Sequence, residues 1–291
     1  MKAIKTLLCC IGRKENQYIR EYVEYYKGLG FTNICLYDNN FDGDEDFHDA
    51  IGDYIDDGYV ILKDYRNKSL CQVQSYDECY HEYKNDYDWI AFFDCDEFLT
   101  FTNQDNTDIS KVLSDSKFNE YDMIHVNWML FEDNGLVRND GRPVLERFTK
   151  PMPYDKKFRN PFVCDNAYIK SIIRGGLDDV KFDTPLTPDN VEKCCDGNGN
   201  KINGAMVTCP INYECMYLRH FSFKTIEEFI KKLDRGFPDH PHRTPRYMME
   251  LKGVFFKVNE PTAEKLEYVK DMIGLDLFRF YPEIIRKDKE D

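Results

Sequence analysis

The chain lacks an excess of basic residues and lacks any long apolar run. Its 39 Lys and Arg face 53 Asp and Glu, which gives a formal net charge of −14. Binding to nucleic acid normally needs a basic face, so we expect no nucleic-acid partner. No segment reaches the roughly 18–20 apolar residues that span a bilayer, and the apolar run from Thr6 to Ile11 is too short for a secretion signal. These absences predict a cytoplasmic protein.

The chain also lacks the cysteine patterns of disulfide-rich and zinc-binding proteins. Its 11 cysteines are an odd number, and Cys9, Cys10, Cys35 and Cys95 stand inside apolar runs. Free cysteine behaves as a small apolar residue in a core. No grouping of Cys and His has zinc-finger spacing. We therefore expect reduced, buried thiols and no zinc site.

The composition is that of one large folded unit. Hydrophobic residues make up 42% of the chain and charged residues 32%, which is typical of soluble globular proteins. No internal repeat, low-complexity tract or heptad run divides the sequence. We predict a single domain over residues 1–291. Within it we expect a nucleotide-binding half (1–105), an acceptor-side half (106–240) and a C-terminal helical tail (241–291).

Short apolar runs alternate with helical patterns in the first third of the chain. The runs at 6–11, 31–37, 59–62 and 89–93 are typical of buried strands. The segments between them repeat apolar residues with helical spacing, as Ile19, Tyr22, Val23 and Tyr26 do. Strands that alternate with helices predict a Rossmann-like α/β fold, with a mostly parallel sheet flanked by helices.

The stretch from Trp89 to Leu99 organises the predicted site. An apolar strand runs directly into three carboxylates, Asp94, Asp96 and Glu97. Carboxylates are seldom buried without a partner, so the strand must end where they meet water, a cation or a substrate. Oxygen ligands of this kind suit Mg²⁺ or Mn²⁺ bridging to a diphosphate.

Other polar residues also follow predicted strands. Gly12, Asp38 and Arg66 come after the first three strands, as the acids come after the fourth. The carboxyl ends of parallel strands share one edge of a sheet, where ligands bind in open α/β folds. Together these residues predict a crevice of the size of a nucleotide.

Later segments carry fewer signals. Residues 122–131 alternate, with His125 and Asn127 on a face that we expect to be solvated or functional. Residues 170–174 read as another strand, and 175–210 show no clear period, which predicts loops with or without short hairpins. Thr225 and Glu228 form a capping box that opens a helix ending at Gly236. Two short helices are expected after Pro261.

Several motifs in this order resemble a known family. The central match is Asp88 to Leu99, with the Asp-x-Asp-Glu-Phe block. It is accompanied by Arg13-Lys-Glu15, Gly30 to Asn40, Gln72 with Tyr76 and Cys79, Val126-Asn-Trp128 with Phe131, Lys170 to Arg174, and Arg219-His220-Phe-Ser-Phe-Lys224 running on to Arg235-Gly236. The chain resembles the glycosyltransferase family 2-like proteins with the GT-A fold, close to glycosyltransferase family 92. Related chains often carry Tyr after the His and Ser after the Lys, where this one has Phe221 and Thr225.

The resemblance implies a metal-dependent transferase with a nucleotide-sugar donor. It implies a UDP-sugar and Mn²⁺ (or Mg²⁺), with Asp94, Asp96 and His220 at the metal. It implies donor contacts from Asp38 to the uracil or ribose, from Asp94 to the ribose and from Lys224 to the diphosphate, with Arg66 and Gln72 as further pocket residues. The expected acceptor is a glycan or a lipid-linked glycan at the inner face of a membrane, to which the protein would be peripheral.

An inverting transferase also needs a general base beside the acceptor hydroxyl. Glu132 and Asp133 follow a predicted strand and are the first candidates, although a turn explains the same residues. Asp165, Asp178 and Asp179 are rivals, and the stereochemistry stays open. Trp128 fits either a core position or a platform for the acceptor. The basic stretch Lys156, Lys157 and Arg159 fits either a solvated loop or a contact with an anionic glycan or membrane surface.

Two other function classes remain open from the sequence. A phosphatase of the haloacid dehalogenase type also uses an Asp-x-Asp motif after a strand, with Asp178 and Asp179 as later acids. Its motif normally follows the first strand, however, whereas here it follows about the fourth. A non-catalytic protein that binds sugars or nucleotides on the same fold is the second alternative.

Overall fold

The computed structural model describes residues 4–105, 107–152, 166–236 and 246–287. The basic stretch at 156–159 and the candidate base Asp165 lie outside the described residues.

The first part of the chain folds as the sequence predicts. Strands β1 (Thr6–Gly12), β2 (Asn33–Asp38), β3 (Val60–Asp64) and β4 (Trp89–Phe92) pair in parallel in the order β3-β2-β1-β4. Helices α1 (Asn16–Gly28), α2 (Phe47–Asp56) and α3 (Gln72–Tyr83) connect them. The prediction of an α/β fold with helices flanking a large, mostly parallel sheet is confirmed.

The second part of the chain extends the same sheet. It contributes β5 (Glu97–Phe101), β6 (Met123–Leu130), β7 (Ile169–Arg174) and β10 (Met216–His220), and a hairpin of β8 (Lys193–Asp196) and β9 (Lys201–Asn203). The order continues β4-β7-β6-β10-β5, with β7 antiparallel to both neighbours and β5 antiparallel to β10. The predicted halves therefore share one sheet. Short elements α4 (Ile109–Leu113), a 3-10 turn (Ser116–Phe118) and α5 (Val144–Arg147) connect these strands.

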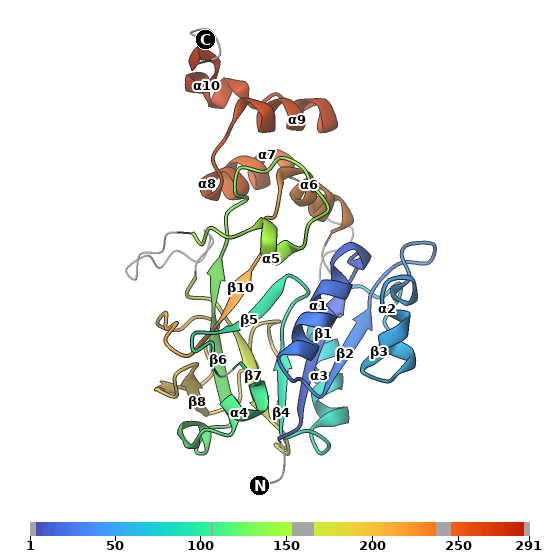
Figure 1. Cartoon of the computed structure of the whole chain (residues 1–291), viewed down its shortest axis with the longest axis vertical. Coiled ribbons are helices and arrows are strands. Elements are labelled where there is room, and N and C mark those ends of the chain that lie inside the picture. The colour runs from blue at the N-terminus through green and yellow to red at the C-terminus, as the bar shows by residue number, and fades with distance from the viewer. Residues whose placement is uncertain (1–3, 106, 153–165, 237–245, 288–291) are drawn as a thin grey trace.

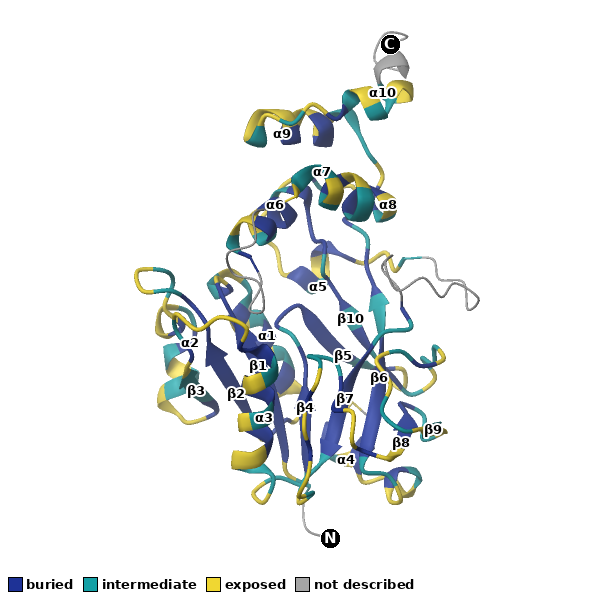
Figure 2. Cartoon of the chain, turned by 180° about the vertical axis from the view of Figure 1, so that it is seen from behind, coloured by how far each residue is buried: buried dark blue, intermediate teal, exposed yellow. Residues whose placement is uncertain are grey.

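Alternating residues of β1, β2 and β4 enter two apolar clusters, one on each face of the sheet. In β1, Leu8 and Cys10 pack with α1 and α2, whereas Leu7 and Cys9 pack with α3. Figure 2 shows central strands such as β1, β4 and β7 mostly dark blue between helices whose outer faces are exposed. The expectation of a solvated face on β6 is wrong, because His125 and Asn127 are both buried. The chain around Cys209 covers Asn127, whose side chain donates to the Cys209 carbonyl.

A third apolar cluster holds the C-terminal part of the chain. It joins α6 (Ile226–Arg235) to α7 (Tyr247–Glu250), a π-helical turn (Leu251–Phe255), α8 (Phe256–Val258) and α9 (Ala263–Ile273). A 3-10 turn (Phe278–Phe280) and α10 (Pro282–Lys287) follow. Figure 1 shows α9 and α10 at the end of the molecule away from α4. The predicted helical tail is present, and within the described ranges no helix has the length and apolar character to cross a membrane.

Candidate active site

A cavity opens at the carboxyl edge of the sheet, where β1 and β4 end. Its empty volume, with the open mouth included, is about 760 Å³. It is lined by Ile11, Arg13, Glu15, Gln72, Asp94, Cys95, Asp96, His220, Ser222, Lys232, Arg235 and Gly236. Four of the predicted site residues therefore meet here: Gln72, Asp94, Asp96 and His220.

Strand pairing brings His220 to the acids. The central stretch is not one continuous strand, because β4 ends at Phe92 and β5 begins at Glu97. In the antiparallel pair of β5 and β10, His220 lies opposite Glu97. Asp96 accepts a further backbone bond at its carbonyl from the N–H of Phe221. The histidine thus reaches the Asp-x-Asp block across more than a hundred residues of sequence.

Asp94 is held by a buried cation and two neutral donors. Its Oδ1 lies 2.9 Å from Lys170 Nζ and accepts from Gln72 Nε2 and the Tyr76 hydroxyl at the same distance. Lys170 is fully buried. Burial would lower the pKa of this ammonium, but Asp94 and then Glu97 raise it, so Lys170 stays charged.

Asp96 is ionised in spite of its burial. Its Oδ2 lies 2.7 Å from Lys232 Nζ, and its Oδ1 lies 3.6 Å from His220 Nε2. Burial alone would raise the pKa of Asp96, but Lys232, His220 and Lys224 hold it well below its usual range. Burial lowers the pKa of His220, which favours the neutral imidazole with a free lone pair.

Glu97, the third acid, lies beneath the cavity rather than in it. It is completely buried, and its Oε2 accepts from the backbone N–H of Asp94 at 2.9 Å. Burial raises the pKa of this carboxyl well above its usual range. Glu97 therefore acts as a support for the loop that presents Asp94 and Asp96.

The opposite wall contains an ion pair that the sequence reasoning did not assign to the site. Arg235 Nη1 lies 2.5 Å from Glu15 Oε1 and donates to the Arg13 carbonyl at 3.0 Å. Arg13 is buried and donates to the Asn39 carbonyl. Its Nη1 is buried with no hydrogen-bond partner among the described residues, and so is Glu15 Oε2. The wall therefore holds unsatisfied polar atoms of both signs.

Lys232 is another cavity residue that the sequence reasoning did not assign to the site. It stands on α6 with Glu228 four residues before it and Arg235 three residues after it. Residues at these spacings share one face of a helix. The sequence shows this polar stripe beside the apolar face of α6, and the stripe could have indicated Lys232 as a site residue. A search for apolar periodicity does not detect it.

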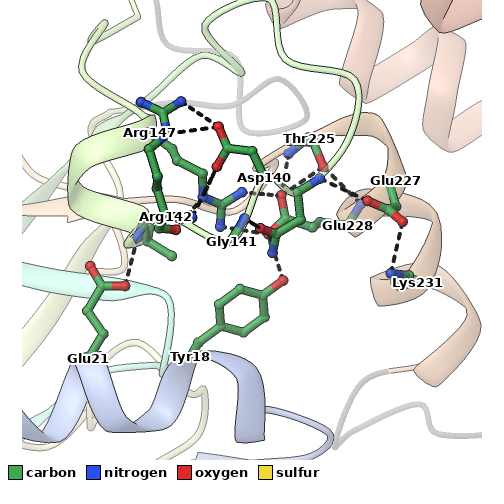
Figure 3. A network of polar contacts seen from close by, with 12 residues as sticks. Tyr18, Glu21, Asp140, Gly141, Arg142, Arg147, Thr225, Glu227, Glu228 and Lys231 are labelled. Carbon is green, nitrogen blue, oxygen red and sulfur yellow. Dashed lines mark hydrogen bonds and ion pairs between the residues drawn. The ribbon is translucent and has the colours of Figure 1, made fainter.

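A buried polar network sets the start of α6 and thereby the positions of Lys232 and Arg235. The predicted capping box is confirmed, with Thr225 Oγ1 accepting from the Glu228 backbone and the Glu228 carboxylate accepting from Thr225. Glu228 also makes two bonds to the Arg147 guanidinium, at 2.8 and 2.9 Å, and accepts from the Tyr18 hydroxyl at 2.7 Å. Figure 3 shows these groups converging between α1, the segment around α5 and the first turn of α6.

Three predicted donor contacts lie outside the cavity lining. Asp38 and Arg66 form an ion pair at 2.8 Å, and Asp38 also accepts from the backbone and side chain of Asn40. Lys224 is buried with its Nζ 4.5 Å from the centre of the Tyr18 ring, and burial lowers its pKa. The structure gives these three side chains partners within the protein.

The two candidate bases also lie away from the cavity. Asp133 Oδ2 is 2.5 Å from Lys265 Nζ, and its Oδ1 accepts from the backbone N–H of Gly135. Glu132 is half-buried and does not line the cavity. This geometry therefore supports the interpretation of these residues as part of a turn rather than as a catalytic base. A base role for either residue finds no support in the described contacts.

The later acids of the phosphatase alternative are at the wrong edge of the sheet. Asp178 pairs with Lys84, which follows α3, and its side chain is 93% exposed. The adjoining Arg174 pairs with Trp89 at the amino end of β4, whereas Asp94 follows its carboxyl end. Asp178 therefore cannot act with Asp94 as that chemistry requires.

The described residues contain no cluster of three or more His, Cys, Asp or Glu side chains placed to hold a metal ion. Asp96 and His220 nevertheless form a fitting pair. Their 3.6 Å separation allows one ion to lie about 2.1 Å from both atoms. His220 Nδ1 is buried without a hydrogen-bond partner in the described part of the chain, and Nε2 is the ring nitrogen on the side of Asp96. A carboxylate oxygen and a neutral imidazole nitrogen suit Mn²⁺.

The comparisons with known proteins agree with the family suggested by the motifs. The profile of Glycosyltransferase family 92 matches residues 5–176, which is more than half of the chain. The chain therefore belongs to glycosyltransferase family 92. A rice protein (Oryza sativa subsp. japonica) of the same family is 25% identical over 100 residues, which are 34% of this chain and 17% of the rice protein. The match thus spans about a sixth of that relative's length.

A crystal structure of GalNAc-T7 with UDP, GalNAc and Mn²⁺ is also similar in part. It covers 46% of this chain and 24% of its own, with 13% identity and a TM-score of 0.27. A likeness at this level carries no argument about the fold or the ligands of this chain.

Proposed function

We infer that the protein transfers a sugar from a nucleotide-sugar, a UDP-sugar, to a hydroxyl of a glycan or lipid-linked glycan acceptor. The observation that carries this proposal is the Asp96–His220 pair inside a cavity at the carboxyl edge of the sheet, in a chain of glycosyltransferase family 92. Ligands of open α/β sheets bind at this edge.

The same pair is the proposed metal site. Asp96 Oδ1 and His220 Nε2 would hold Mn²⁺ or Mg²⁺, with Asp94 beside them in the cavity lining. A divalent ion at this place would supply Lewis-acid stabilisation of the diphosphate leaving group. Four of the predicted donor or metal residues line the cavity. The loop after β4 and the end of β10 contribute three of them, Asp94, Asp96 and His220.

The cations of the cavity supply the remaining electrostatic stabilisation. Arg13, Lys232 and Arg235 line it, and cations placed where negative charge develops lower the barrier to leaving-group departure. Lys170 fixes Asp94 from behind through the 2.9 Å ion pair. Gln72 and Tyr76 orient the same carboxylate by hydrogen bonds. These contacts keep the first aspartate in one position while a donor binds.

The finer parts of the proposal come from the sequence alone. Inversion at the sugar, the contacts of Asp38, Arg66 and Lys224 with the donor, and a cytoplasmic protein peripheral to the inner face of a membrane stay predictions. For the base, the described carboxylates that line the cavity are Glu15, Asp94 and Asp96.

Titration calorimetry with UDP, with and without Mn²⁺, tests the proposal on the wild type and on Asp96→Ala. We expect metal-dependent binding that Asp96→Ala weakens by about a hundredfold or more, because the metal loses its carboxylate ligand. Lys84→Ala, on the opposite edge of the sheet, should leave binding unchanged. Absence of UDP binding under every metal condition would overturn the UDP assignment.

Turnover of bound UDP-sugars separates a transferase from a non-catalytic binding protein. Slow hydrolysis to UDP and free sugar, detected without any acceptor, should accompany binding in the wild type. Tight binding with neither hydrolysis nor transfer would favour the non-catalytic alternative.

A further inference from the structure

Asp96, the carboxylate proposed to hold the metal, already has a cation beside it. Lys232 Nζ lies 2.7 Å from Asp96 Oδ2 and donates to the Ser222 carbonyl at 3.2 Å. An ammonium has three N–H donors, and among the described residues these two contacts leave a third for a ligand in the cavity. The Asp96 oxygen on the His220 side is not the one that Lys232 binds.

The cavity lining is balanced in charge without a metal ion. Among its described residues, the carboxylates Glu15, Asp94 and Asp96 are matched by three cations. Those cations are Arg13, Lys232 and Arg235, and Lys170 adds another positive charge behind Asp94. A free divalent cation would therefore enter a wall with no net negative charge. A diphosphate brings the negative charge that the ion needs.

The two lysines that pair with Asp94 and Asp96 differ in how freely their side chains can move. Lys170 is completely buried, and its Nζ also donates to the Pro185 carbonyl at 2.7 Å. Lys232 keeps 18% of its side chain exposed, stands in the last turn of α6 and lines the cavity. Its long stem lets the ammonium turn without any movement of the helix. Of the two, Lys232 is the cation able to leave its aspartate.

We propose that Lys232 is an exchangeable counter-ion of Asp96 that makes metal binding depend on the nucleotide. In the free protein, Lys232 neutralises Asp96 and weakens the binding of a divalent cation alone. When the metal and the diphosphate enter together, the ammonium turns from Asp96 to a phosphate oxygen. Lys232 is thus a binding residue of the donor site. This inference rests on the proposed function for the identity of the diphosphate, but its first test does not.

The first test measures Mn²⁺ alone, from the electron paramagnetic resonance signal of the unbound ion. Lys232→Met keeps the apolar stem and removes the charge. It should bind Mn²⁺ about tenfold more tightly than the wild type, since a like charge beside the ligand is gone. Lys232→Arg keeps the charge and should bind Mn²⁺ as weakly as the wild type, which separates charge from packing.

The second test measures the coupling between UDP and Mn²⁺. In the wild type each should tighten the binding of the other, and Lys232→Met should reduce that factor by about tenfold, by linkage. Lys231→Met is the matched control, because Lys231 is on the same helix with 63% of its side chain exposed and pairs with Glu227 (Figure 3). This control should behave as the wild type in both tests.

The outcomes separate the two proposals. Mn²⁺ binding by Lys232→Met that is equal to or weaker than that of the wild type overturns the counter-ion role, and so does a lack of Mn²⁺ binding by both proteins. Tighter Mn²⁺ binding by Lys232→Met without any UDP binding would keep Lys232 as the counter-ion of Asp96. That result would instead remove the nucleotide from the proposed function.

Discussion

Acidic and basic residues of this chain take their charge states from their surroundings rather than from their type. Asp96 is buried beside Lys232 and stays ionised, whereas burial raises the pKa of Glu97, the very next residue. His125 is a further case, since it is completely buried and neither ring nitrogen has a hydrogen-bond partner among the described residues. Burial lowers its pKa to about 4.

The buried His125 predicts a loss of stability in mild acid. The unfolded chain binds the proton near the ordinary histidine pKa of about 6.5, while the folded protein resists it until about pH 4. The free energy of unfolding should therefore fall as the pH drops from about 6.5 to about 4, by up to about 3 kcal/mol from this residue. Urea unfolding across that pH range measures the effect.

Substitution isolates the contribution of His125. His125→Leu should remove that part of the pH dependence, whereas His81→Gln, on the exposed face of α3, should keep it. An unchanged pH profile in His125→Leu would contradict the assignment.

Among the helices and strands, α6 links the buried network to the cavity. Its first turn is fixed by Arg147 and Glu228, whose side chains are 1% and 2% exposed, and its last turn carries Lys232 and Arg235. Glu228 is held by several donors at once, so the start of the helix has little freedom. The network therefore contributes to the site through the position of the helix.

Arg147→Met should be strongly destabilising. It leaves Glu228 buried without its main cationic partner, and breaking a buried pair in this way costs about 3–5 kcal/mol. Arg142→Met is the control, because Arg142 is 53% exposed and pairs with the exposed Asp140 (Figure 3), so we expect a loss below about 1 kcal/mol. Chemical denaturation gives both values. Equal losses of stability in the two variants would show that the buried network stabilises the fold no more than the exposed ion pair does.

In the whole molecule, α9 is joined to the rest of the fold by apolar packing and by a buried ion pair. The third apolar cluster connects α6 with α7, α8 and α9. Lys265 of α9 is completely buried and pairs with Asp133, which follows β6. This pair gives Asp133 a structural role at a distance from the cavity lining.

Asp133→Asn distinguishes that role from catalysis. It leaves the Lys265 ammonium buried without its counter-charge, so we expect a loss of several kcal/mol (about 3–5) in stability. Faster hydrogen exchange over residues 263–273 should accompany a lower melting temperature, with UDP affinity retained in the folded fraction. A large fall in turnover with unchanged stability would instead restore Asp133 as the base. Glu132→Gln, at the half-buried neighbour, should change neither property.

Features that depend on near neighbours in sequence were predictable from the sequence. The helical period of α1 buries Ile19, Tyr22, Val23 and Tyr26 as expected, and the Thr225–Glu228 capping box forms as expected. Strand ends followed by polar residues placed Asp94 and Asp96 at the correct edge of the sheet. Each of these depends on spacing within a few residues, which the covalent chain itself fixes.

The tertiary structure alone decided which side chains face one another. Asp96 meets Lys232 across 136 residues of sequence, and His220 reaches the acids through the register of β10 against β5. The same long-range packing paired Asp38 with Arg66 and Asp133 with Lys265, away from the cavity lining. Sequence alone determined the α/β fold and the location of the acidic site. The partner of each charge was left to strand order and helix packing, because Coulomb and hydrogen-bond contacts act over a few ångströms of space regardless of separation along the chain.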